Sequence, residues 1–192
     1  MKTTKITYAE LFSERGSKYD AAMRRFPNAR DEEFNHAISI VDIASTMAVL
    51  DVPAGGEYLR RFIPKKCNYI GHEPCSNFLN EGSHNVVDLL PLPIADNTID
   101  VGFSIAGIHH IEDKTTVFNE LARVLKPSGK FVLADVYSGS NVAIFLDDFV
   151  GKYNSTGHEG IYINENTLSE LTAANFSILQ ANRQPFYWQF KD

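Results

Sequence analysis

The stretch MAVLDVPAGGEYLRRF, residues 47–62, decides the fold. Apolar and β-forming residues run into Asp51, a Pro-Ala-Gly-Gly turn follows, and an amphipathic segment begins at Tyr58. This order predicts a strand over Ala48–Val52, a tight turn, and a helix over Tyr58–Ile63. An α/β protein commonly holds a nucleotide-like ligand at such a turn, because glycines let the backbone approach the ligand.

From residue 48 onward, predicted strands alternate with predicted helices. Such alternation indicates βαβ units with right-handed crossovers, and therefore an α/β fold with a doubly wound parallel sheet covered by helices on both sides. The expected strands are Ala48–Val52, Asn68–Glu73, Asn85–Asp88, Ile99–Ile105 and Lys130–Val136. The expected helices are Tyr58–Ile63, Cys75–Glu81 and Asp113–Leu125, the last ending at a Lys-Pro-Ser-Gly sequence.

The first 46 residues are expected to form a helical cap. Apolar residues recur at helical spacing from Tyr8 to Phe26, with Gly16 as a candidate break. Pro27 interrupts the pattern, and the acids that begin at Asp31 favour the start of a second helix. These helices are expected to act as a lid, although packing of a helical layer explains the same pattern.

The C-terminal residues follow a different pattern. A short helix is expected over Asn164–Ala174, and a strand over Phe176–Ala181. A last strand is indicated by the alternating residues Phe186, Trp188 and Phe190. Only residues 183–185 separate these two strands, which is too short for a crossover helix. They are therefore expected to close the sheet as an antiparallel hairpin.

Composition limits the class of protein. The chain has 192 residues, 44% of them apolar, which suits one soluble domain with a proper core. A net charge of −6 argues against a nucleic-acid partner, because phosphate contact needs basic patches. The basic pairs are diluted by nearby acids, so a solvated surface is expected for Arg24-Arg25, Arg60-Arg61 and Lys65-Lys66.

Cysteine usage and hydropathy indicate a reducing compartment. Cys67 and Cys75 belong to no CxxC or Cys/His cluster, so neither a disulfide framework nor a metal site is expected. The N-terminal residues lack the apolar segment of a signal peptide, and no apolar run is long enough to cross a bilayer. A cytoplasmic location with no membrane partner is expected.

Acids and glycines stand at three expected strand ends. Asp51 and the Gly55-Gly56 turn follow the first strand, Glu73 ends the second, and Asp88 ends the third. In an open parallel sheet, ligands bind beyond the carboxyl ends of the strands. Glu73 also stands at about the spacing at which dinucleotide-type sites place a ribose-binding acid. Each feature alone is weak evidence, since a glycine pair after a strand is more often just a turn.

The next segment is more specific. Residues 86–135 read VVDLLPLPIADNTIDVGFSIAGIHHIEDKTTVFNELARVLKPSGKFVLAD. The acid at Asp88, the Leu-Pro…Asp stretch 92–100, the paired histidines 109–110 and the helix end 120–129 resemble the class I S-adenosylmethionine-dependent methyltransferases. The resemblance is to the small-molecule enzymes of that class, which include the ubiquinone and menaquinone biosynthesis methyltransferases. It implies a Rossmann-like fold and S-adenosylmethionine as the cofactor.

The resemblance also implies residue roles. Asp51 and Gly55 would meet the methionine end of the cofactor, and Glu73 the ribose hydroxyls. Asp88 and Leu89 would face the adenine. The full expected cofactor-binding set is Asp51, Pro53, Ala54, Gly55, Glu57, Glu73, Pro74, Asp88, Leu89, Ile105, Ala106 and Tyr19.

The glycine loop departs from the family pattern at two positions. Pro53 and Glu57 stand where the family's Asp-x-Gly-x-Gly-x-Gly sequence has glycines. A proline is compatible with a φ near −65°. Glu57 allows two interpretations: its side chain crowds the ligand or the helix start, or it is stabilised at a helix N-terminus and reaches the cofactor's ammonium group.

Methyl transfer is an in-line displacement at an activated carbon, so positioning supplies much of the rate. A base is needed only for an acceptor that arrives protonated. The candidate catalytic residues are His109, His110 and His158, although the first two are equally explained as structural or pocket-lining residues.

The expected function is therefore methyl transfer from S-adenosylmethionine to a small-molecule acceptor, by a single domain that is a monomer or a homodimer. Its parts would be a cap (1–46), a cofactor-binding core (47–136) and an acceptor-side insert with the hairpin (137–192). Two alternatives remain: a protein of the same fold that binds the cofactor without transferring methyl groups, and another nucleotide enzyme such as a nicotinamide dehydrogenase. The absence of a GxGxxG sequence disfavours the second.

Overall fold

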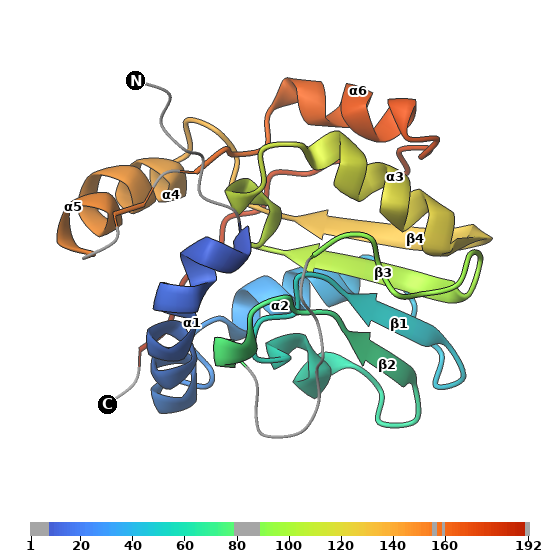
Figure 1. Ribbon diagram of the computed structural model, residues 1–192, viewed down its shortest axis with the longest axis horizontal. Coiled ribbons are helices and arrows are strands. Elements are labelled where there is room, and N and C mark those ends of the chain that lie inside the picture. The colour runs from blue at the N-terminus through green and yellow to red at the C-terminus, as the bar shows by residue number, and fades with distance from the viewer. Residues whose placement is uncertain (1–7, 79–88, 155–156, 159, 191–192) are drawn as a thin grey trace.

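The structure is a computed structural model that describes residues 8–78, 89–154, 157–158 and 160–190. In that part of the chain, four parallel strands form one twisted sheet (Figure 1) in the order β2-β1-β3-β4. The strands are β1 (Ala48–Asp51), β2 (Asn68–Gly71), β3 (Ile99–Ile105) and β4 (Leu125–Ala134). The predicted parallel, doubly wound sheet is confirmed.

Strand order reverses at β1, since β2 pairs on one side of it and β3 on the other. Asp51, the last residue of β1, lies level with Gly71 and Phe103 of its two neighbours. The carboxyl ends of three strands therefore meet at one edge, where an α/β sheet binds its ligands.

Helices cover both faces of the sheet, and β1 is buried on each side. Val49 packs toward the helix α2 (Asp31–Ser39) and the 3₁₀ turn η1 (Tyr58–Phe62), whereas Leu50 packs toward α3 (Lys114–Val124) and α6 (Glu165–Ala173). Figure 1 shows α3 and α6 side by side on one face and α2 on the other. Continuous apolar strands such as β1 are expected where both faces are buried.

The N-terminal cap is confirmed as two helices, α1 (Tyr8–Arg25) and α2, separated at Pro27. Helix α1 lies at the carboxyl-end edge of the sheet (Figure 1) and packs on the 3₁₀ turn η2 (Ser76–Phe78). Gly16 does not break α1, so that expectation is wrong. A β-carbon at Gly16 would lie 3.2 Å from Asn77, and glycine therefore permits the close approach of α1 to η2.

The predicted C-terminal hairpin is wrong. Residues 174–190 contain no strand. Their backbone bonds to the N-terminal cap instead: the Gln189 N–H donates to the Ala29 carbonyl at 2.9 Å, and the Tyr187 N–H donates to Glu32 Oε2 at 2.8 Å. Leu179, in the first of the two expected strands, is 82% exposed, and Phe186 and Trp188 pack beside Asn141, Val142 and Phe145 without forming a strand.

Other boundaries differ by a few residues from the expected ones. Strand β4 begins at Leu125 rather than residue 130, because Leu125 pairs with Ile99 before the register shifts. A helical stretch that the sequence analysis did not predict follows β4, as α4 (Asn141–Ile144), the π-helical turn η4 (Phe145–Val150) and α5 (Gly151–Tyr153). The predicted strand Asn85–Asp88 lies outside the described residues, as does the end of the helix predicted over Cys75–Glu81.

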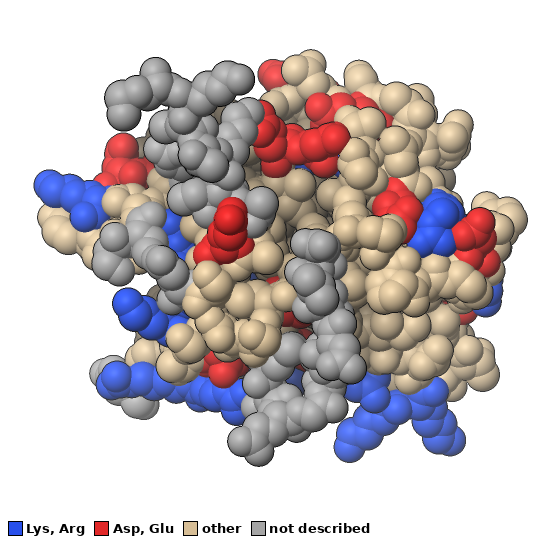
Figure 2. Space-filling view, viewed as in Figure 1, with Lys and Arg blue, Asp and Glu red and all other residues tan. Residues whose placement is uncertain are grey.

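On the face shown in Figure 2, basic side chains gather mainly along the lower rim and acidic ones lie mostly above it. Two of the basic pairs from the sequence have acidic partners, since Arg24 pairs with Asp20 at 2.5 Å and Arg61 pairs with Asp31. None of the helices in the described ranges is both long and apolar enough to cross a membrane.

Candidate functional site

Glu73 lies just beyond the end of β2 and is fully buried. Its Oε2 accepts hydrogen bonds from the Gly55 N–H at 2.8 Å and the Tyr8 hydroxyl at 3.1 Å, and its Oε1 accepts from the Cys75 N–H at 2.9 Å. The carboxylate of Glu73, the predicted ribose acid, therefore contacts both the glycine loop after β1 and helix α1.

Asp51 is the second buried carboxylate at this edge, with 3% of its surface exposed. Its Oδ2 accepts from the Tyr69 hydroxyl at 2.7 Å. Burial raises the pKa of Asp51 to about 7 against that hydrogen bond, and the charges of Glu57 and Glu73 raise it further. Burial also raises the pKa of Glu73 to about 7, against the hydrogen bonds that favour its ionised form.

This pair of carboxylates suits a ligand that brings hydroxyl groups and positive charge. Such groups stabilise the ionised acids and offset the cost of burying them. Tyr69, the donor to Asp51, was not found by sequence reasoning. Tyr69 lies on β2, which pairs with β1, so its contact with Asp51 could be predicted only once the register of the two strands was known.

The glycine loop itself has left-handed backbone at two positions. Gly55 has a φ of 53° and Glu57 a φ of 57°, which is the conformation that glycine favours. Glu57 stands at the N-cap position of η1, as one of the two interpretations expected, but its side chain makes no capping hydrogen bond there. Its carboxylate lies against the end of β2 instead, where a β-carbon on Gly71 would be 2.8 Å from Glu57 Oε1.

The other predicted cofactor residues surround this edge. Pro53, Ala54 and Pro74 are buried next to Asp51 and Glu73 in the chain. Ile105 ends β3, and Ala106 follows it with a φ of 49° while its N–H donates to the Ala134 carbonyl.

Two further predicted residues lie at the border of this edge. The Leu89 carbonyl lies 2.9 Å from Nε2 of His72, a buried histidine that sequence reasoning missed. Tyr19 of α1 packs against Tyr58 and Phe78 beside the glycine loop. Asp88 lies outside the described residues.

The three predicted catalytic histidines come together at a second place. His109 and His110 lie in the 3₁₀ turn η3 (Ile108–His110) after β3, and His158 lies in the loop before α6. The ring centroids of His109 and His158 are 5.8 Å apart, and those of His110 and His158 are 5.4 Å apart. We call these three residues the histidine cluster.

Carboxylates orient two of these rings. His109 Nδ1 lies 2.6 Å from Oδ1 of Asp135, whose side chain is fully buried, and His158 Nδ1 lies 3.3 Å from Oδ1 of Asp147. The Tyr162 hydroxyl donates to the same Asp147 oxygen at 2.6 Å. Asp135 follows the end of β4, so the strand-end rule that found Asp51 could have found it, whereas Asp147 lies on a helical turn that no pattern predicted.

Burial lowers the pKa of both His110 and His158, and the charge of Arg15 lowers both further. For His158, the hydrogen bond and charge of Asp147 oppose this shift without reversing it. Both rings are therefore neutral at pH 7. Nδ1 of His110 is buried and has no hydrogen-bond partner among the described residues. The histidine cluster thus offers neutral imidazole nitrogens that can accept a proton or bind a metal.

Helix α1 connects the carboxylates to the histidine cluster. The Phe12 ring lies 4.6 Å from the ring of Tyr8, which donates to Glu73, and 5.1 Å from the ring of His110. The two parts of the site are therefore joined by two adjacent aromatic side chains of one helix.

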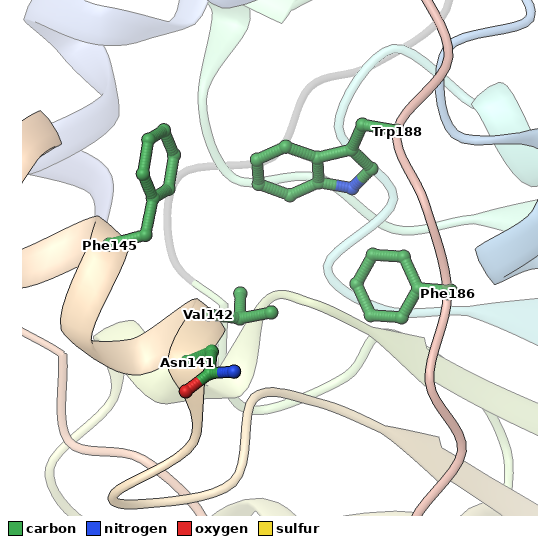
Figure 3. Close-up of a pocket in the computed structure, with 5 residues that line it drawn as sticks. All are labelled: Asn141, Val142, Phe145, Phe186 and Trp188. Atoms are coloured by element: carbon green, nitrogen blue, oxygen red, sulfur yellow. The ribbon is translucent and has the colours of Figure 1, made fainter.

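A shallow apolar groove lies elsewhere, between α4 and the C-terminal segment (Figure 3). It is lined by Asn141, Val142, Phe145, Phe186 and Trp188. None of these residues belongs to a strand end or to the histidine cluster, so the groove is separate from the site described above.

Comparison with known proteins agrees with this geometry. Residues 50–133 match the family described as methyltransferase domain. The uncharacterized methyltransferase YcgJ of Bacillus subtilis is 31% identical over 160 residues, covering 76% of this chain and 61% of YcgJ. The demethylmenaquinone methyltransferase of Corynebacterium urealyticum is 33% identical over 101 residues, covering 50% of this chain and 44% of that enzyme. The chain thus spans less than two thirds of either relative.

Solved structures with a similar fold include methyltransferases. A S-adenosylmethionine-dependent methyltransferase of Thermotoga maritima superposes with a TM-score of 0.65 at 12% identity, covering 89% of this chain and 82% of that one. Residues 50–133 thus match a methyltransferase-domain family, and the fold is that of solved S-adenosylmethionine-dependent methyltransferases, in agreement with the sequence resemblance. The cofactor implied by this match is S-adenosylmethionine.

Proposed function

We propose that this protein transfers a methyl group from S-adenosylmethionine to a small-molecule acceptor. The observation that carries the proposal is the hydrogen bond from the Gly55 N–H to Glu73. It joins the glycine loop after β1 to the acid after β2, which is the arrangement that holds a nucleoside with its ribose hydroxyls against a carboxylate.

Glu73 would accept the ribose hydroxyls in charge-assisted hydrogen bonds. A carboxylate has about four lone-pair positions, and three donors from the described residues already use Glu73. A diol brings two more donors, so one present donor must leave. Tyr8 is the side-chain donor among them, so cofactor binding is expected to displace its hydroxyl. When bound, the cofactor supplies an activated methyl group.

Asp51 would face the positively charged end of the cofactor, because its buried carboxylate is stabilised by a nearby cation. Ile105 and Ala106, at the end of the adjacent strand β3, would flank the methionine portion. We also propose that Asp88 contacts the adenine, the role that the family resemblance implies for it.

The histidine cluster would form the acceptor side. An imidazole of His109, His110 or His158 would take the proton of a hydroxyl or amine acceptor as its oxygen or nitrogen bonds to the methyl carbon, the S–CH3 bond breaks and S-adenosylhomocysteine leaves. We place all three parts, 1–46, 47–136 and 137–192, in one domain. We infer a small acceptor because the sequence resembles the small-molecule methyltransferases. A reducing cytoplasm suits the two free, buried cysteines.

Calorimetric titration with S-adenosylmethionine and S-adenosylhomocysteine at pH 8, where Glu73 is ionised, tests the site. Glu73→Gln replaces one acceptor oxygen by a donor, so we expect a loss of about 1.5–3 kcal/mol in cofactor binding. The variant also leaves a buried N–H without an acceptor, so a lower melting temperature is expected.

Asp100→Asn is the matched control. Asp100 also accepts a backbone N–H, that of Ala48 at 2.9 Å, but near the opposite ends of the strands. Equal affinity in wild type and Glu73→Gln would place the cofactor elsewhere. Cofactor binding without any methylated product in an acceptor screen would favour the alternative of a binding protein without transferase activity.

A further inference from the structure

The histidine cluster has a property that methyl transfer does not require. One ring nitrogen from each of His109, His110 and His158 lies within 4.8 Å of the other two. Three imidazoles converge in this way from two separate segments, η3 after β3 and the loop before α6. Imidazole nitrogen is a common protein ligand of zinc and of neighbouring transition metals.

Hydrogen bonds already set the ring orientations that metal binding needs. His109 and His158 each direct Nδ1 toward a carboxylate, that of Asp135 at 2.6 Å and that of Asp147 at 3.3 Å. This leaves Nε2 of both rings for a ligand. Metal-binding histidines commonly have a carboxylate on the second ring nitrogen, which fixes the tautomer and makes the ligand nitrogen more basic.

The third ring supplies an independent observation. Nδ1 of His110 is buried and accepts no hydrogen bond from any described residue. A buried polar atom without a partner costs free energy, and such atoms are rare in folded proteins. A metal ion on the cluster would give one of the His110 nitrogens a bond and offset part of that cost.

We propose that His109, His110 and His158 form a three-histidine site for a divalent transition metal, with zinc as the best match. The site has nitrogen ligands and no thiolate, which favours zinc, cobalt or nickel over magnesium or calcium, since the latter two prefer oxygen ligands. Three protein ligands leave a fourth tetrahedral position for water or for a hydroxyl group of another molecule.

The geometry requires a modest closure of the rings. Nitrogens bound to one zinc at about 2.0–2.1 Å lie about 3.4 Å apart, compared with the present limit of 4.8 Å. The His158 side chain is 7% exposed, so closure requires a small rotation of the His110 and His158 rings toward His109 within their present surroundings. The charges of Asp135 and Asp147 favour a cation there, while those of Arg15 and Lys114, which act on His110, oppose it.

This proposal does not depend on methyl transfer, because it concerns metal binding alone. If both proposals hold, the metal would take over the role that a free imidazole has above. The three histidines would hold the ion, and the ion would lower the pKa of a hydroxyl group at its open position, as zinc does for bound water. No metal site was expected from the sequence, because neither cysteine belongs to a CxxC or Cys/His cluster; His110 and His158 are 48 positions apart, so their convergence appears only in the fold.

Titration of metal-free protein with zinc, in competition with a chelating dye, tests the site. We expect one zinc per chain, and a cobalt complex with the intense visible absorption of tetrahedral coordination. His158→Ala should weaken zinc binding at least 100-fold, and Asp147→Asn about 10–100-fold, as is typical when a carboxylate partner of a ligand is lost.

His36→Ala, which removes a histidine of α2, is the matched control and should bind zinc like wild type. His158→Gln keeps the side-chain volume and should also lose zinc, and thermal unfolding checks that each variant is folded. Absence of stoichiometric binding in the wild type would overturn the proposal. So would zinc binding that survives in both His158 variants, or that falls equally in His36→Ala.

Discussion

Replacement of Glu57 by glycine tests the loop at which this chain departs from its family. Glu57 adopts a φ of 57°, in the left-handed region. A non-glycine residue there costs about 1–2 kcal/mol, which Glu57→Gly removes. Glycine also makes the unfolded chain more flexible, which costs about 0.4–1 kcal/mol. The net expectation is a gain of about 0.5–1 kcal/mol in the free energy of unfolding, or about 1–4 °C in melting temperature for a chain of this length.

Cofactor affinity is the second readout of Glu57→Gly. The Glu57 carboxylate lies against the end of β2, so its removal should change affinity by less than about tenfold, or about 1.4 kcal/mol. Thermal unfolding and calorimetry measure the two quantities on the same samples. Asn97→Gly is the control, since Asn97 has the same φ of 57° outside the glycine loop.

Two results would refute this reasoning. A lower melting temperature in Glu57→Gly would mean that contacts of the Glu57 side chain outweigh the backbone strain. An affinity gain well above tenfold would mean that the carboxylate blocks the cofactor site. The second result would favour the alternative of a cofactor-binding protein without transferase activity.

Three further predictions concern the two parts of the site. Asp51 and Glu73 have a pKa of about 7 in the folded protein, above the values of about 4 in an unfolded chain, so the native state holds extra protons between pH 4 and 7. Their contribution to the free energy of unfolding is therefore full below pH 4 and is lost as the pH rises through 7. Thermal unfolding of the cofactor-free protein should show a melting temperature that falls over this range. A melting temperature that does not change with pH would contradict the prediction. Tyr8→Phe removes the side-chain donor that competes for Glu73, so cofactor affinity should rise about 2–10-fold in calorimetry; a loss of affinity would mean that Tyr8 contacts the cofactor instead. His158→Ala should lower turnover about 100-fold or more with cofactor binding retained, whether His158 acts as a base or as a metal ligand; unchanged turnover with the true acceptor would remove it from the catalytic residues.

Local sequence patterns predicted the sheet because burial on both faces demands continuous apolar strands. β3 was predicted at its observed bounds, and α3 within a residue at each end. The hairpin failed because alternation alone cannot show whether a buried face is available. The backbone of residues 187–189 found hydrogen-bond partners in the N-terminal cap, more than 150 positions away in the chain.

The candidate site was predictable where it follows strand ends. Asp51, Gly55 and Glu73 follow from the rule that parallel strands present their carboxyl ends at one edge. Tyr8 and Tyr69 were missed because their roles depend on how α1 and β2 lie against those strands. The convergence of His158 with His109 likewise depends on the path of the chain after β4, which includes a helical stretch with no predicted counterpart.

The position of α1 has a consequence for how the two parts of the site communicate. Tyr8 and Phe12 lie one helical turn apart, so a movement of α1 that frees Glu73 also withdraws the Phe12 ring from His110. Any ligand that favours one position of the helix then alters the free energy of binding at both places. An acceptor that favours the displaced helix strengthens cofactor binding by a certain factor. By thermodynamic reciprocity, the cofactor strengthens acceptor binding by the same factor. A single turn of helix would thereby couple occupancy of the two halves, in addition to the contact between acceptor and cofactor that methyl transfer itself requires.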